Sequence, residues 1–87
     1  MAAVDMEGFE EAMKIAKSYG RVKPEEENEI RRAFYVRLAL CEMHGGADGL
    51  CKKLLDMASA LSKEKTLEDI GRLECDEDDK EKMRKMV

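Results

Sequence analysis

The residue types most capable of metal binding or nucleophilic chemistry are three cysteines and a single histidine. They follow the spacing Cys-x2-His-x6-Cys-x23-Cys and are Cys41, His44, Cys51 and Cys75. Together they could form a tetrahedral Cys3His site of the structural zinc kind. That spacing matches no standard zinc signature, and Cys41 and Cys51 fall on apolar helix faces, where free cysteine is a common small core residue. We therefore expect buried thiols and no metal, with a structural zinc site as the alternative.

His44 is also the one side chain suited to general-base chemistry near neutral pH. No serine or cysteine nucleophile with a recognisable local motif accompanies it, and a histidine at a helix end usually interacts with the terminal carbonyl groups. The acidic run 76–79 lacks the alternating ligands, the glycine and the closing glutamate of an EF-hand calcium loop. These patterns predict neither an enzyme nor a calcium-binding protein.

Charged residues make up 41% of the 87-residue chain, yet the net charge is only −4. Basic doublets occur at 31–32 and 52–53, but acidic residues are interspersed and no segment is strongly basic. This mixed, slightly acidic pattern is typical of solvated helix faces and argues against nucleic acid as a partner. Nucleic acid is an expected partner only in the alternative in which the chain binds zinc.

The composition predicts an all-α fold. Ala, Leu, Met, Glu, Lys and Arg favour helices, and two Phe, two Tyr and no Trp argue against a β-rich fold. A chain of this length predicts one domain over 1–87. Its start does not resemble a signal peptide, and no run approaches the roughly 20 apolar residues of a membrane span. We therefore expect a cytoplasmic or nuclear protein in a reducing compartment, without a membrane partner.

Hydrophobic periodicity predicts a small bundle of three main antiparallel helices, plus a short helix and a C-terminal helix. The main helices are expected at 4–19, 25–44 and 48–63. The last two form a core hairpin over 25–61. The motif Thr66-Leu67-Glu68-Asp69 resembles a capping box and predicts that the short helix begins there. The segment 66–87 has few apolar residues per turn, so we expect it to be weakly anchored.

The second predicted helix is apolar over most of its circumference between Ile30 and Met43. A helix of this kind must be covered on several sides, and two modest neighbours cannot cover it fully. The pattern therefore predicts a homo-oligomer or an obligate complex with another protein. Arg37 lies on a line between two apolar flanks, where an unpaired charge would be costly. Its acidic partner is expected on another chain or at one of Glu11, Asp56 and Asp69. The alternative is that the charged end of Arg37 reaches water between two helices and needs no acidic partner.

These observations predict a small protein–protein interaction module: an adaptor, a regulatory subunit, an inhibitor or a self-associating domain. Met83 and Met86 lie outside the expected core, where adaptable apolar side chains suit partner binding. The expected interface residues are Arg37, Val36, Leu40, Met43, Met83 and Met86. The alternative is a zinc-stabilised helical module that contacts nucleic acid.

Overall fold

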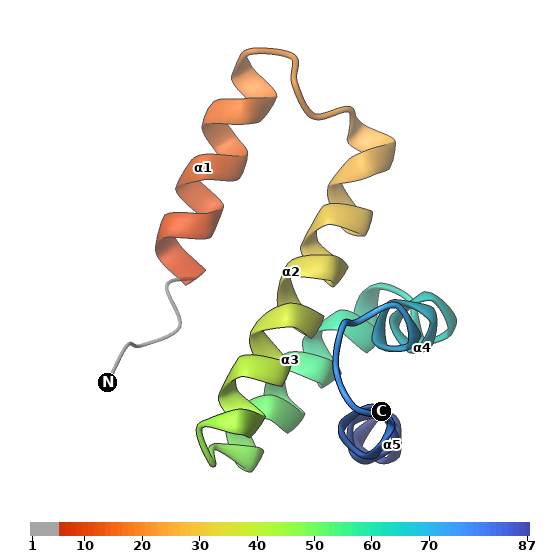
Figure 1. Cartoon of the computed structure of the whole chain (residues 1–87). Coiled ribbons are helices and arrows are strands. Elements are labelled where there is room, and N and C mark those ends of the chain that lie inside the picture. The colour runs from red at the N-terminus through yellow and green to blue at the C-terminus, as the bar shows by residue number, and fades with distance from the viewer. Residues whose placement is uncertain (1–5) are drawn as a thin grey trace.

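The structure is a computed structural model that describes residues 6–87, with side chains from residue 7 onward. This part of the chain is all-helical, as the composition predicted, and contains no strand. The helices are α1 (Met6–Ser18), α2 (Pro24–His44), α3 (Asp48–Leu61), α4 (Lys63–Gly71) and α5 (Glu77–Met86) (Figure 1). Helix α1 stands apart at one side, whereas α2 to α5 gather around a common core (Figure 1). Within residues 6–87, no helix is both long enough and apolar enough to cross a membrane.

Helices α2 and α3 form a hairpin and share the most extensive helix–helix contact. Pro24 lies in the first turn of α2, where a backbone N–H is not required. The N–H of Lys23 donates to the carboxylate of Glu26 at 3.2 Å, which closes this end of the helix. At the other end Gly46 has a φ of +84°, a left-handed conformation that glycine adopts without a steric penalty. The chain can therefore turn back sharply into α3.

The core lies between α2, α3 and the two short C-terminal helices. Its buried residues are Tyr35, Val36, Ala39 and Met43 of α2, Cys51, Leu54, Leu55 and Ala58 of α3, Ile70 of α4 and Met83 of α5. Ile70 and Met83 are both 0% exposed, and full burial of such a side chain contributes about 1.5–3 kcal/mol. This packing argues against weak anchoring of 66–87, because one large buried side chain fixes each of the two short helices. The relative stability of this segment stays a prediction.

Helix α4 begins earlier than the sequence predicted. The hydroxyl of Ser62 accepts a hydrogen bond from the N–H of Lys65 at 3.3 Å, so Ser62 is the N-cap. Thr66 lies inside the helix, fully buried, and its hydroxyl donates to the carbonyl of Ser62 at 2.7 Å. The predicted capping box at 66–69 is therefore wrong. Asp69 does not cap a helix and instead pairs with a side chain of α2.

Helix α1 is held to α2 mainly through side chains. The two helices run alongside each other like the arms of a hairpin, joined at the top of the view by residues 19–23 (Figure 1). The rings of Phe9 and Phe34 stack between the arms, with their centroids 3.9 Å apart and their planes 12° from parallel. Gly20, with a φ of +70°, follows α1 and begins the connection to α2. A closed antiparallel bundle of α1, α2 and α3 stays a prediction.

Candidate interaction surface

The four residues of the possible zinc site lie at separate places. Cys51 is fully buried in the core, whereas Cys41 is exposed on α2, contrary to the expectation of a buried thiol. The Nε2 atom of His44 lies 2.9 Å from Oδ2 of Asp79 in α5. Cys75 is half-buried between α4 and α5. Within residues 7–87, no three His, Cys, Asp or Glu side chains are grouped closely enough to hold a metal ion, so the Cys3His site is not assembled.

The two less exposed thiols have a raised pKa. Burial raises the pKa of the Cys51 thiol, and the nearby carboxylate of Asp48 adds to the rise. Burial also raises the pKa of the Cys75 thiol. Since the thiolate is the nucleophile, a raised pKa lowers the fraction of each side chain that is nucleophilic at neutral pH.

The buried arginine of α2 is Arg32, whereas Arg37 was the residue predicted to have a covered charge. Arg32 is 6% exposed, and its Nε donates to Oδ2 of Asp69 at 3.3 Å. A charge removed from water is costly unless it is paired, so this ion pair both satisfies Arg32 and fixes α4 against α2. Arg32 is covered because α4 packs against this side of α2. Arg37 is exposed.

Three of the six predicted interface residues are buried in the chain's own core and are unavailable to a partner: Val36, Met43 and Met83. Leu40 and Met86 are half-buried and pack at the edge of the core. Arg37 is the one exposed member of the set. The adaptable methionine surface expected at the C-terminus is therefore largely used to complete the core.

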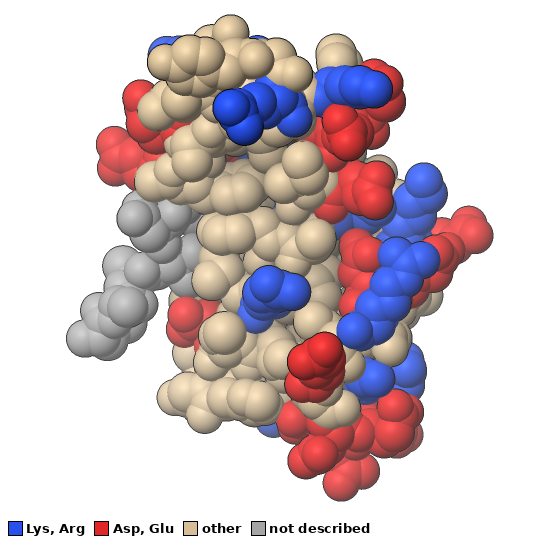
Figure 2. Space-filling model, turned by 45° about the horizontal axis from the view of Figure 1, so that its top comes forward, with Lys and Arg blue, Asp and Glu red and all other residues tan. Residues whose placement is uncertain are grey.

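A strip of α2 stays exposed after the core is complete. We call this strip the α2 face, and it consists of Ile30, Ala33, Arg37, Leu40 and Cys41. Ile30 is 37% exposed, and Leu40 is half-buried. Figure 2 views the side on which α2 covers α3 and shows most charged side chains at the margins of a broad uncharged area, with isolated basic side chains inside it. Apolar side chains around an isolated charge are typical of a protein-binding surface.

One edge of the α2 face is hollowed into a groove against the end of α4. The groove combines apolar and charged side chains and is lined by Glu29, Ala33, Val36, Arg37, Leu40, Asp69, Arg72, Leu73 and Glu74. Asp69 is already paired with Arg32. Within residues 7–87, the side chains of Glu29, Arg37 and Glu74 have neither a hydrogen bond nor an ion pair. The groove therefore offers a partner apolar contact and three unpaired charges, the acids Glu29 and Glu74 and the base Arg37.

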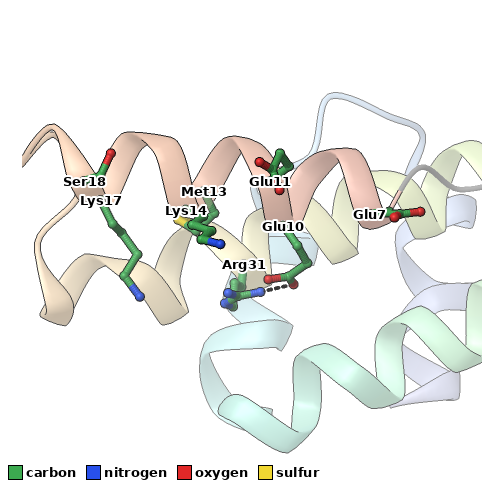
Figure 3. A pocket seen from close by; sticks show the side chains of 8 residues that line it. All are labelled: Glu7, Glu10, Glu11, Met13, Lys14, Lys17, Ser18 and Arg31. Carbon is green, nitrogen blue, oxygen red and sulfur yellow. Dashed lines mark hydrogen bonds and ion pairs between the residues drawn. The ribbon is translucent and has the colours of Figure 1, made fainter.

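A second hollow lies along α1 and reaches Arg31 of α2 (Figure 3). The guanidinium of Arg31 points to the carboxylate of Glu10 and pairs with it (Figure 3). Arg31 also pairs with Glu27 at 3.0 Å, and the Nζ of Lys17 lies 2.8 Å from the same carboxylate. The hydrogen bond from Arg31 lowers the pKa of Glu10, and hydrogen bonds from Lys17 and then Arg31 lower the pKa of Glu27. Because these charges neutralise one another, we interpret the hollow as the attachment of α1 and not as a ligand site.

Sequence reasoning missed Glu29 and Ala33, because neither residue is apolar enough or chemically distinctive enough to stand out. The available signal was their spacing, since Glu29, Ala33 and Arg37 follow one another at intervals of one helical turn. Comparisons of the chain with protein-family models, with curated proteins and with solved structures gave no match. The α2 face and its charges are therefore the features of the molecule that indicate a function.

Proposed function

We propose that the chain is a protein–protein association module that binds another polypeptide through the α2 face, without catalysis. The observation that carries this proposal is the exposed apolar strip that α2 retains although α3 and α4 bury its opposite side. Ile30 and Leu40 supply apolar contact, and Arg37 places an unpaired charge among them. In such an interface, buried apolar area supplies most of the affinity, and charges select the partner and its orientation.

A module of this kind fits an adaptor, a regulatory subunit, an inhibitor or a self-associating domain. The three cysteines are free thiols, which is compatible with a reducing compartment, so we place its action in the cytoplasm or the nucleus. The closed antiparallel bundle belongs to the same proposal. A partner seated on α2 would lie beside α1 and favour a position of α1 closer to α2.

The proposal is tested by a charge placed on the α2 face and by the same charge placed elsewhere. Ile30 on α2 and Met57 on α3 are 37% and 39% exposed, so Ile30→Glu and Met57→Glu are matched in chemistry and exposure. We expect Ile30→Glu to weaken association by about tenfold or more, because a charge is desolvated when the interface closes. Met57→Glu should leave association unchanged. Association is measured as self-association by sedimentation and as proteins cross-linked to the chain in its native cells.

Circular dichroism serves as the control, because both variants must keep the helical content of the original chain. Equal association by the original chain and the Ile30→Glu variant would contradict binding through the α2 face. Equal losses in the two variants would also contradict it, since the effect would then not depend on which surface carries the charge.

A further inference from the structure

We infer that the α2 face binds a second copy of this chain, with the two α2 helices antiparallel and a two-fold axis at Ala33. This inference rests on the proposed function and names its partner. It begins from a ridge on α2 in which Glu29, Ala33 and Arg37 follow one another at intervals of one turn. All three are exposed. The ridge therefore presents an acid, a small residue and a base in a row.

The two charges of this ridge differ from the other charges at the centre of α2. Arg31 pairs with carboxylates of α1 and α2, and Arg32 pairs with Asp69 of α4. Glu29 and Arg37, in contrast, have no side-chain partner within residues 7–87. They lie eight residues apart on a rigid helix, too far to pair with each other directly. Their natural complement is a surface that carries a base and an acid at the same separation and in the reverse order.

The chain itself supplies such a surface when it is turned end to end. In a two-fold interface, a residue that contacts another across the axis is contacted by it in return. With the axis at Ala33, Glu29 of each copy faces Arg37 of the other, which gives two equivalent ion pairs. A parallel arrangement would instead place Arg37 against Arg37, and like charges in contact disfavour that orientation. The charges therefore select the antiparallel arrangement.

The residue at the axis allows the two helices to approach closely. The distance between packed helices depends on the side chains at the crossing point, and alanine at that point permits a short one. At such a distance, long Glu and Arg side chains one turn away on each side can reach the opposite helix. Ile30 and Leu40, one turn and two turns from the axis, become covered in the same interface.

The position of α1 is compatible with this arrangement. Its contacts lie along the N-terminal half of α2, because Phe9 stacks on Phe34 and Lys17 pairs with Glu27. Within residues 7–87, no ring contact or ion pair joins α1 to the last two turns of α2, from Leu38 to His44, where Cys41 is exposed. End-to-end reversal places α1 of each copy beside the C-terminal half of α2 of the other. The arrangement therefore uses a part of α2 that α1 leaves free.

The test exchanges the two charges on the intact chain. In sedimentation at low salt, the original chain should form a dimer, and Glu29→Arg and Arg37→Glu should each weaken it by about tenfold or more. A mixture of the two single variants should form a mixed dimer, since one variant carries two bases and the other carries two acids at these positions. The double variant should dimerise again with itself. Lys53→Glu, an exposed charge change on α3, is the matched control and should have no effect.

A disulfide locates the axis independently. In a Cys41→Ser background, Ala33→Cys should form an oxidised dimer, because a two-fold axis brings the same position of both copies within the 4.4–6.8 Å Cα separation of a disulfide, about the closest approach of packed helices. Lys53→Cys in the same background should form no disulfide-linked dimer on oxidation. Formation of both disulfides at equal rates would overturn the inference, because collisions alone would explain it.

Failure of this inference can be distinguished from failure of the proposed function. If the original chain is monomeric at about 100 µM, or if mixing the charge variants restores nothing, self-pairing at Ala33 is overturned. Should Ile30→Glu still abolish cross-linking to another protein in that case, the α2 face retains its proposed role with a different partner. If a dimer forms that neither Ile30→Glu nor the charge variants affect, both proposals fail.

Discussion

Two parts of this molecule are held together in different ways. Helices α2 to α5 share a core of fully buried side chains, to which even the short α4 and α5 contribute Ile70 and Met83. Within residues 7–18, helix α1 adds no residue to that core and has one buried apolar side chain, Met13. It meets α2 through ring contacts of Phe9 with Phe34 and Tyr35 and through ion pairs around Arg31. Apolar burial is cooperative and insensitive to salt, whereas partly exposed ion pairs are weak and screened. We therefore expect α1 to separate from α2 without unfolding of the rest.

The largest effect should come from truncation of the shared core. Ile70 is 0% exposed, so Ile70→Ala leaves a cavity and should reduce the free energy of unfolding by about 2–5 kcal/mol. Ile15 on α1 is 49% exposed, and Ile15→Ala should change the free energy of unfolding by less than about 0.5 kcal/mol. Urea denaturation measures both. A smaller loss for Ile70→Ala than for Ile15→Ala would restore the original expectation that 66–87 is weakly anchored.

The next effect concerns the ion pair that joins α4 to α2. Asp69→Asn leaves the buried guanidinium of Arg32 without its counter-charge and should cost about 1–3 kcal/mol of unfolding free energy. Asp56 also pairs with a base, Lys52, but 57% of its side chain is exposed. Asp56→Asn should therefore cost less than about 1 kcal/mol.

Replacing both partners checks the physical cause of this loss. In Arg32→Met combined with Asp69→Leu, no buried charge is left unpaired, so much of the stability lost in Asp69→Asn should return. If the double variant is less stable than Asp69→Asn alone, the attraction within the pair, and not the cost of an unpaired charge, determines the stability of this contact.

A smaller and more local effect is expected at the ring stack. Phe9→Ala removes an aromatic contact worth about 1 kcal/mol, so α1 should be less tightly held. Hydrogen exchange should accelerate in α1 and stay unchanged in α3, whose Leu55 is fully buried. Equal acceleration in the two helices would show that α1 and the core unfold as one unit, which would remove the distinction between the two regions.

The smallest effect is the response of α1 to acid. Pairing lowers the pKa of Glu10 and of Glu27 below the ordinary value of 4.5. A lowered pKa in the folded state adds stability above the unfolded value, and this contribution is lost as pH falls through the folded pKa. Hydrogen exchange of α1 relative to α3 should therefore increase below about pH 4.5. In Glu10→Gln the increase in α1 exchange at low pH should be smaller, whereas Glu11→Gln should show the same increase as the original chain.

Local signals in the sequence were sufficient to predict the helices. Gly20 and Gly46, which follow α1 and α2, adopt left-handed conformations, and Pro24 begins α2. These features depend on neighbours within a few residues, so the sequence contains them directly. The capping box at Thr66 failed because Ser62 offered a competing N-cap four residues earlier.

The faces of α2 could not be assigned from the sequence. Apolar residues lie around most of this helix, so periodicity did not indicate which strip is buried. The choice depends on where α4 and α5 dock. The ion pair with Asp69 of α4 holds Arg32 in a buried position, and Met83 of α5 is buried in the core. Arg37 and Cys41 remain exposed. These contacts join residues that are far apart in the chain, so no local sequence pattern indicates them.

The short turn between α2 and α3 also sets the order in which the chain can fold. Met43 and Cys51 stand close on either side of Gly46 and both belong to the core. Closing so short a loop costs little entropy, and helical proteins rich in local contacts fold in roughly microseconds to milliseconds. We expect the α2–α3 hairpin to nucleate folding, with α4 and α5 joining it next. Helix α1 then attaches last, when Phe9 packs against the Phe34 ring, which the folded hairpin already holds in place.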